Sequence, residues 1–362
     1  MNTLHLFLSH VNHNFEIIRK QLRSSTECIG VVKANAYGSH AIHFAKRLVE
    51  LGINKLAVAY AEEGIQLREQ GIKTPIMVFY PQRNSIAGVI GANLEPCIYS
   101  RELMNSFKLY LEAMAIKDYP IHIKYNTGLN RVGFPVIDVA WVLEKTDNPQ
   151  FRLESVYSHL AISEEERPSA KCMLQIERFE EIKKIHIESV QTAPKFHLLN
   201  SSGVFNYPEY QYDAVRCGIA FHGYANKSEW DALLKPVAVL KSKISQIHQL
   251  KKGAFVGYDN GWITPDAVTI ATLPLGHADG IGRHFGHHQS TVNINGQNAS
   301  IVGNVCMDML MIDITGIDCE TGDEVTFFDT SKSAEDFARS GNTISYELLT
   351  GIGPRIKRLL HH

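Results

Sequence analysis

CIGVVKANAYG, residues 28–38, places a lysine at the end of a short and almost wholly apolar run. The apolar part, residues 28–32, is typical of a strand covered on both faces, and Lys33 then lies at its carboxyl end. Burial disfavours the charged ammonium, so a lysine in this position can present a neutral amine that condenses with an aldehyde. The stretch fits equally well a lysine that extends its charged group from a strand end into solvent.

The composition is that of a globular protein with a sizeable core. The 362 residues are 44% hydrophobic, enough for one large or two ordinary domains. Lys+Arg 36 against Asp+Glu 38 gives a formal net charge of -2, which attracts neither nucleic acid nor anionic lipid. The six cysteines are scattered like the reduced thiols of a cytosolic protein. No apolar run approaches membrane-spanning length. We therefore expect a cytoplasmic protein that acts on a small molecule, with no nucleic-acid or membrane partner.

Eight short apolar runs alternate with helix-like segments up to about residue 224. Residues 42–49 carry apolar side chains at helical spacing after the first run, and a charge-rich helix is predicted over residues 168–189 after the sixth. Eight βα units predict a closed (β/α)8 TIM-like barrel, with an open doubly wound sheet as the alternative. The predicted strands span residues 28–33, 55–60, 75–80, 94–99, 120–125, 152–159, 195–199 and 213–217.

The pattern changes after Tyr224, which indicates a second, mostly β C-terminal domain. Residues 292–301 alternate around an Asn-Gly pair, the strongest short-range hairpin signal in a sequence. Two more strands are predicted over residues 309–314 and 324–328, and a helix over residues 345–360 with a break at 351–354. We predict a barrel domain over residues 1–230 and a β-rich domain over residues 231–362. Residues 1 to about 10 are free to join the second domain.

Polar residues collect at the carboxyl ends of the predicted strands. A barrel enzyme builds its site on this face and often binds phosphate in the loops after strands seven and eight. Hydroxyls and backbone N–H groups in those loops, 200–203 and 218–219, can hold a phosphate. Each residue alone has an ordinary alternative, such as a helix cap or a surface ion pair. Their gathering on one face favours an active site, and they are Lys33, Lys124, His159, Asn200, Ser201 and Arg216.

Six motifs, in this order, resemble those of the alanine racemase family, which consists of pyridoxal-phosphate enzymes built from a barrel and a β domain. The resemblance runs over nearly the whole chain. It implies interconversion of L-alanine and D-alanine, supply of D-alanine for peptidoglycan, and a homodimer with shared active sites. The motifs are VKANAYG (32–38), NTGLNRVGF (126–134), NSSG (200–203), VRCGI (215–219), VGY (256–258) and GNVCMD (303–308).

The resemblance assigns two bases that act on opposite faces of the substrate. It implies that Lys33 carries pyridoxal phosphate as an aldimine and then acts on one face of the Cα, while Tyr258 acts on the other. Inversion through a planar carbanion requires removal of a proton on one side and delivery on the other. Tyrosine has a reference pKa of about 10, so Tyr258 needs help from cationic or hydrogen-bonding neighbours. Across the dimer interface, Tyr258 and Met307 would reach the Lys33 of the partner chain.

The resemblance also assigns the residues around the cofactor ring. Arg216 would face the pyridine nitrogen and His159 would orient Arg216. Because arginine does not release its proton, the ring becomes a weaker electron sink than it is beside a carboxylate. Arg131 would lie near the phenolic oxygen and the substrate carboxylate. Lys124 matches a position that is often carbamylated, and a carbamate would turn its repulsion from Arg131 into a pair.

The remaining cofactor-binding and substrate-binding residues follow from the same motifs. Tyr37, Ser201, Gly218 and Ile219 match phosphate-binding positions, and Asn200 belongs to the same loop. Met307 matches a backbone donor to the substrate carboxylate.

The sequence departs from the family pattern at two positions. Gly353 stands where a tyrosine often touches the phosphate, so one phosphate contact is expected to be missing. His277 stands where a tyrosine is usual at the mouth of the site, and it could alter substrate access. The histidines at 284, 287 and 288 have no carboxylate or cysteine at ligand spacing, so we predict an exposed loop there and no metal site.

Three alternative functions stay open at this point. One is a racemase of broader specificity, acting for example on serine. A second is a decarboxylase on a similar barrel, although such enzymes place an acidic residue where Arg216 stands. A third is a cofactor-binding protein without racemase activity, and the full second domain with Tyr258 and Met307 argues against it.

Overall fold

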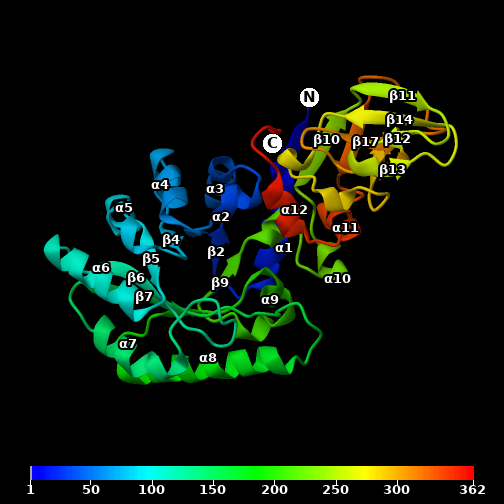
Figure 1. The fold of residues 1–362 in the computed structure, drawn as a ribbon. Helices are drawn as coiled ribbons and strands as arrows, with labels where there is room; N and C mark the ends of the chain where they lie inside the picture. Colours follow the sequence, from blue (N-terminus) through cyan, green and yellow to red (C-terminus); the bar gives the residue numbers. More distant parts are fainter. Residues whose placement is uncertain (1) are drawn as a thin grey trace.

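The computed structural model describes residues 2–362. They form a (β/α)8 barrel and a mostly β unit beside it (Figure 1). The barrel is closed because β2 pairs with both β3 and β9, which confirms the predicted fold class. Its strands are β2 (Glu27–Val31), β3 (Lys55–Val58), β4 (Ile76–Val78), β5 (Glu95–Ile98), β6 (Tyr119–Lys124), β7 (Phe151–Tyr157), β8 (Lys195–His197) and β9 (Ala214–Cys217).

The eight strands coincide with the eight predicted apolar runs, and helices lie between them. The predicted helix over residues 168–189 is α8, which Ser169 caps by accepting a hydrogen bond from the Cys172 backbone N–H. Its buried residues recur at helical spacing and face the barrel. The helices before and within the barrel are α1 (Leu8–Gln21), α2 (Lys33–Tyr37), α3 (Ala41–Glu50), α4 (Ala61–Glu69), α5 (Ile86–Gly91), α6 (Arg101–Ala113), α7 (Val139–Thr146), α8 (Ala170–Ser189) and α9 (Ser201–Asn206).

A nine-stranded sheet organises the second unit, in the order β11-β14-β17-β16-β15-β18-β10-β1-β19. The predicted hairpin is β15–β16, whose turn residues Asn295 and Gly296 both have positive φ, as the tight hairpin turn requires. The elements are β1 (Thr3–Phe7), α10 (Ser228–Asp231), β10 (Ala238–Lys243), β11 (Gln246–Leu250), β12 (Phe255–Val256), β13 (Trp262–Ile263), β14 (Val268–Leu273), β15 (Thr291–Ile294), β16 (Gln297–Val302), β17 (Leu310–Asp313), β18 (Glu324–Phe328), α11 (Ala334–Ser340), α12 (Ser345–Gly351) and β19 (Lys357–His361).

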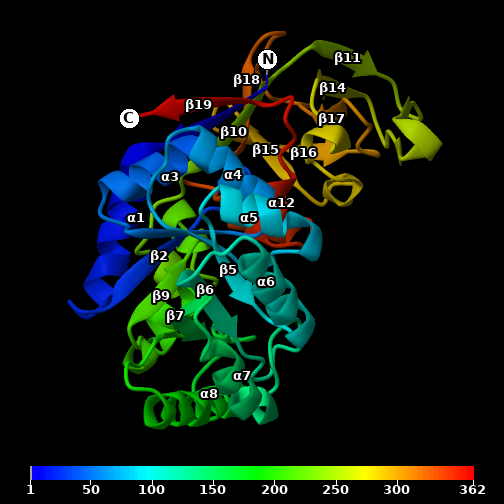
Figure 2. The same cartoon turned by 90° about the vertical axis from the view of Figure 1, so that its left-hand side faces the viewer.

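The two ends of the chain meet in this sheet. β1 pairs antiparallel with β10 on one side and parallel with β19 on the other, as Figure 2 shows. The prediction of helix up to residue 360 is therefore wrong. α12 ends at Gly351, before Pro354, and the segment beyond it satisfies its backbone hydrogen bonds along β1 instead.

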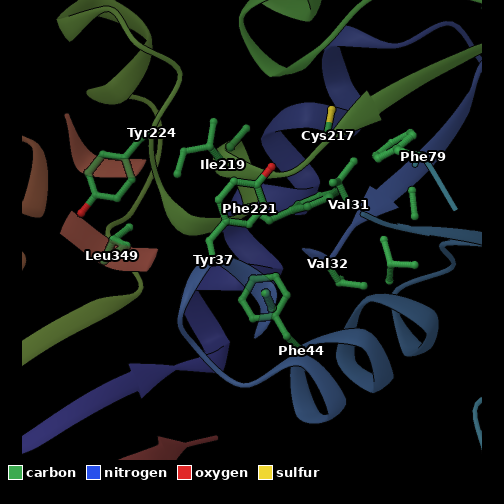
Figure 3. Packing of buried hydrophobic residues seen from close by; sticks show 14 of the residues in the cluster. Val31, Val32, Tyr37, Phe44, Phe79, Cys217, Ile219, Phe221, Tyr224 and Leu349 are labelled. Carbon is green, nitrogen blue, oxygen red and sulfur yellow. The ribbon is translucent and has the colours of Figure 1, made fainter. Parts of the chain in front are cut away.

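Apolar side chains pack between the barrel and the second unit, next to the turn that starts at Lys33. Figure 3 shows Tyr37 and Phe44 in one buried cluster with Val31, at the end of β2, and Ile219, in the segment after β9, and with Leu349 of α12 nearby. The close approach of Gly38 to Leu349 fixes this contact, since a Cβ at Gly38 would lie 1.9 Å from the Leu349 carbonyl oxygen. The second unit thus adjoins the mouth of the barrel.

No helix in the described part of the chain combines the length and apolar composition needed to cross a bilayer. Within residues 2–362, no group of three or more His, Cys, Asp or Glu side chains is arranged as it would be around a metal ion.

Candidate active site

Lys33 begins a left-handed turn directly after β2. Residues 34–37 are not glycine, yet all have φ between 50 and 54°. This conformation costs roughly 1 kcal/mol per residue, and such segments gather at functional sites. Surrounding contacts hold the turn, since the Ala34 N–H donates to the Glu63 carboxylate and the Gly38 N–H donates to the Ala34 carbonyl. The turn places both Lys33 and Tyr37 on the wall of the same cavity.

That cavity, of about 280 Å³, lies at the carboxyl ends of the barrel strands. It also contains the side chains of Phe79, Tyr80, Tyr157 and Tyr346. The structure brings together here the predicted site residues Lys33, Tyr37, Lys124, Arg131, His159, Asn200, Ser201, Arg216, Gly218 and Ile219.

Positive charge dominates the cavity. Two lysines and two arginines line it, and no aspartate or glutamate is among the described residues that do so. Burial, together with repulsion from Arg131, lowers the pKa of Lys33 against an opposing effect of Glu63. Burial, then repulsion from Arg131 and Arg216, lowers the pKa of Lys124 to about 8. The cavity therefore favours an anionic ligand, and both lysines favour their neutral amine form more than a lysine in water does.

Arg216 is held more firmly than the sequence predicts. It is 3% exposed, and burial lowers its pKa to about 10. Its Nη2 donates to His159 Nδ1 at 3.1 Å, the contact that the family resemblance implies, and to the carbonyl oxygens of Ser158 and Leu198. Its Nη1 donates to Nδ1 of His197 at 2.7 Å. Sequence reasoning missed His197, although it lies in a predicted strand next to Arg216's strand.

Hydroxyl and backbone groups form another part of the cavity wall. The Ser201 Oγ accepts hydrogen bonds from the backbone N–H groups of Gly218, at 3.2 Å, and Ala220. Position 218 must be glycine because a Cβ there would lie 2.2 Å from the Tyr37 hydroxyl. The Asn200 side chain caps α9 by accepting from the Gly203 N–H at 2.9 Å.

Tyr346 was not predicted as a site residue. It lies on α12 and reaches the same end of the cavity as Tyr37, with 5.9 Å between the two ring centroids. The Asn226 amide donates to its hydroxyl at 3.2 Å and also to Ser202 Oγ. Gly353 lies elsewhere, with its N–H bonded to the Asp279 carbonyl. The cavity thus has a tyrosine from the C-terminal part of the chain, Tyr346, and Gly353 does not line it.

Tyr258 and Met307 lie apart from this cavity in the same chain. They line a second hollow on the β unit, and the two cavities have no lining residue in common. Tyr258 is 70% exposed and Met307 59% exposed. The structure of one chain thus does not bring either residue to Lys33.

The remaining histidines of the β unit lie on its surface. His277 is exposed and its N–H donates to the Cys306 carbonyl. The histidines at 284, 287 and 288 are also exposed, as predicted for a loop, and His287 Nε2 lies 2.9 Å from the Asn304 side-chain oxygen.

Comparison with known proteins agrees with this geometry over both units. The family model for the alanine racemase N-terminal domain matches residues 7–226, and the model for the C-terminal domain matches residues 237–360. The chain belongs to the alanine racemase family. This confirms the resemblance inferred from the six motifs.

Individual alanine racemases are similar over nearly their whole length. A curated alanine racemase from Carboxydothermus hydrogenoformans is 35% identical, covering 97% of each chain. The crystal structure of alanine racemase from Streptomyces lavendulae superposes with a TM-score of 0.94 at 25% identity, covering 100% of this chain and 97% of the other. The Bartonella henselae alanine racemase, solved with covalently bound pyridoxal phosphate, has a TM-score of 0.89 at 27% identity, with 99% of each chain covered.

Proposed function

We propose that this chain is a pyridoxal-phosphate-dependent amino-acid racemase that interconverts L-alanine and D-alanine and so supplies D-alanine for peptidoglycan. The observation that carries the proposal is the cavity of Lys33, where a lysine of lowered pKa shares a wall with three other cations and no carboxylate. Membership of the alanine racemase family over both units supports it. The six cysteines are unpaired, in keeping with the reducing cytoplasm where we place the protein.

The cavity fits the cofactor group by group. Pyridoxal phosphate supplies an aldehyde and an electron-withdrawing ring, which together acidify the Cα–H of an amino acid joined to it. The Lys33 amine is the partner for the aldehyde. The hydroxyls of Tyr37 and Ser201, with Asn200 and the backbone at Gly218 and Ile219, would hold the phosphate. Arg216 would donate to the ring nitrogen, with His159 beside it.

Two residues would move the proton. The neutral amine of Lys33 would take or return the Cα proton on one face of the substrate. Tyr258 would do the same on the opposite face. Arg216 would keep its own proton and so would limit the negative charge that the ring can take, which would favour return of the proton to Cα.

Arg131 and the backbone of Met307 would orient the substrate through its carboxylate. Lys124 lies beside Arg131 and, with its pKa lowered to about 8, has an appreciable neutral fraction near physiological pH. We propose that its amine adds to carbon dioxide and releases one proton. The carbamate so formed carries a negative charge that pairs with Arg131.

We further propose a homodimer in which each site takes residues from both chains. Residues 1–230 would bind the cofactor, and residues 231–362 would present Tyr258 and Met307 to the partner. The exposure of both side chains and the apolar character of the surrounding surface support this, since Phe255 and Met309 are also exposed there. A two-fold axis would repeat the same contact at both sites.

Incubation of the cofactor-loaded protein with single enantiomers tests the activity. Loss of optical activity with L-alanine and with D-alanine, without release of carbon dioxide, is the expected result. A panel that includes both serine enantiomers measures specificity. Stable optical activity with every amino acid, despite bound cofactor, contradicts the proposal.

A further inference from the structure

Behind Arg216, a continuous line of hydrogen-bonded side chains crosses the interior of the barrel. Five consecutive strands, from β9 back to β5, contribute one residue each, and Lys55 of β3 ends the line. The successive links are Arg216 Nη1 to His197 Nδ1 (2.7 Å), His197 Nε2 to Ser155 Oγ (2.8 Å), Ser155 Oγ to His122 Nδ1 (2.7 Å), His122 Nε2 to Glu95 Oε2 (2.9 Å) and Lys55 Nζ to Glu95 Oε2 (2.5 Å).

The two ends of this line determine the direction of every hydrogen bond. Arginine can only donate, so His197 Nδ1 accepts, and the proton of that neutral ring lies on Nε2. Nε2 then donates to Ser155, whose hydroxyl must donate onward to His122 Nδ1. His122 in turn carries its proton on Nε2 and donates to Glu95, a carboxylate that can only accept. The four links between Arg216 and Glu95 thus all point toward Glu95, and Lys55 donates to the same carboxylate from the other side.

The burial of the line supports these protonation states. His122 and His197 are each 1% exposed, and burial, the first cause in both, lowers their pKa values. Burial alone would raise the pKa of Glu95, but its bonds to His122 and Lys55 outweigh this and lower it to about 2. Both histidines are therefore neutral and Glu95 is ionised near neutral pH.

Arg216 lacks a closer counter-charge. Its hydrogen bonds go to neutral carbonyl oxygens and imidazole nitrogens, and no carboxylate among residues 2–362 pairs with it directly. A buried charge needs compensation, and hydrogen bonds aligned in one direction polarise one another. A carboxylate at the far end makes each acceptor along the line stronger, including the His197 nitrogen that holds Arg216.

We propose that His197, Ser155, His122 and Glu95 are positioning residues that hold Arg216 as a cation in one orientation toward the cofactor's ring nitrogen. The inference rests on the proposed function for the cofactor, but the line itself is a property of the protein alone. Because the four links between Arg216 and Glu95 point away from Arg216, no atom of the line that faces Arg216 carries a proton to return to it. Arg216 thus has no source from which to replace a proton lost to the ring, and it keeps its own.

The first test uses the protein without cofactor and is independent of activity. Imidazole ¹⁵N NMR should find both His197 and His122 in the neutral Nε2–H form at neutral pH. A proton on Nδ1 of either ring at that pH overturns the proposal, whatever the protein catalyses. Substitution of each histidine in turn by glutamine assigns the signals.

The second test cuts the line in its middle and uses a matched control. Ser155→Ala removes the bridging hydroxyl. Ser242→Ala removes a similarly buried hydroxyl on β10 of the second unit, which donates to the Asn2 side-chain oxygen and touches neither the line nor the cavity. The readout is pyruvate formed per racemisation turnover, because a loosened Arg216 lets the ring take more charge. We expect a rise of roughly fivefold in Ser155→Ala, the effect of losing one typical hydrogen bond, and none in Ser242→Ala.

The test of the line gives a clear result even if one of these variants does not fold. Ser155→Thr keeps a hydroxyl and should restore the wild-type ratio. If Ser155→Ala does not fold, Glu95→Gln tests the same point, because it keeps an acceptor for His122 but removes the charge. Equal pyruvate ratios in wild type and in every folded variant of the line overturn the proposal. If the wild type does not racemise alanine, the proposed function is contradicted. The NMR test of the hydrogen-bonded line still applies in that case.

Discussion

Gly38 lies against Leu349 with no room for a side chain between them. A Cβ at Gly38 would lie 1.9 Å from the Leu349 carbonyl oxygen. Gly38 closes the turn that carries Lys33, and Leu349 lies on the helix that carries Tyr346. This one contact therefore sets the position of a barrel residue relative to a residue of the β unit in the same cavity.

We predict that Gly38→Ala destabilises the protein and weakens cofactor binding, because it displaces both Lys33 and Tyr346. Gly52→Ala is the matched control. Both glycines have positive φ, 79° and 99°, but a Cβ at Gly52 meets nothing within 4 Å. Gly52→Ala should cost only about 1 kcal/mol of backbone strain and leave cofactor affinity unchanged. Thermal unfolding and absorbance titration with pyridoxal phosphate measure the two effects, and equal affinities in the two variants would refute the prediction.

Lys33→Ala should abolish both racemisation and the covalent attachment of cofactor, since the Schiff base and one base are lost together. Borohydride reduction of the loaded protein followed by peptide mass spectrometry should label Lys33 in the wild type. Lys124→Met, altered in the same cavity, should keep the label on Lys33. A label on any other lysine in the wild type would remove Lys33 from its assigned role.

Arg216→Glu should change the chemistry of the bound cofactor. A carboxylate favours a protonated ring nitrogen, so more charge enters the ring and pyruvate formation increases at the expense of racemisation. The absorbance spectrum of the loaded protein in the presence of alanine should change as well. A spectrum and by-product ratio identical to those of the wild type would mean that Arg216 does not face the ring.

Mixing two inactive variants should test the shared site. Neither Lys33→Ala nor Tyr258→Phe is expected to racemise alanine alone. After subunit exchange, a hybrid dimer gathers both changes in one site and leaves the other intact, so about a quarter of wild-type activity should return. Tagged pull-down confirms that exchange has occurred. If activity stays absent in mixtures that contain hybrids, each chain builds its own site and Tyr258 is not donated by the partner.

The buried ammonium of Lys124 should make stability depend on pH. Its pKa is lowered to about 8 in the folded protein, against about 10.4 in the unfolded chain. Between these values the unfolded state binds more protons, so the free energy of unfolding rises with pH. Lys124→Met lacks this dependence. The amount by which its free energy of unfolding exceeds that of the wild type should therefore fall by roughly 3 kcal/mol from pH 7.5 to 10.5. Chemical denaturation of cofactor-free protein in carbonate-free buffer measures it, with Lys46→Met, at an exposed position, as control. A constant difference would contradict the prediction.

The local sequence pattern was sufficient to predict the barrel and most of the residues that line its cavity. Each barrel strand is a contiguous apolar run, and parallel strands place their carboxyl ends on one face. Lys124, His159 and Arg216 could therefore be grouped before any coordinates were known. The family motifs added Tyr258 and Met307, whose proposed roles no spacing within one chain would have indicated.

Contacts between distant segments could not be predicted in this way. The alignment of His197, Ser155 and Glu95 depends on the tilt and stagger of strands around a barrel, which a single sequence does not specify. Tyr346 reaches the cavity only because Gly38 admits α12. The strand at residues 357–361 pairs with residues at the opposite end of the chain, so its own sequence gave no sign of that partner.

The position of β1 between β10 and β19 constrains the order in which the protein can fold during synthesis. All elements of the barrel leave the ribosome before β10 does. The barrel can therefore fold before either of the strands that pair with β1 has been synthesised. The other neighbour of β1, β19, follows every other strand of the sheet in the chain. The edge on which β1 depends is therefore the last part of this sheet to be synthesised.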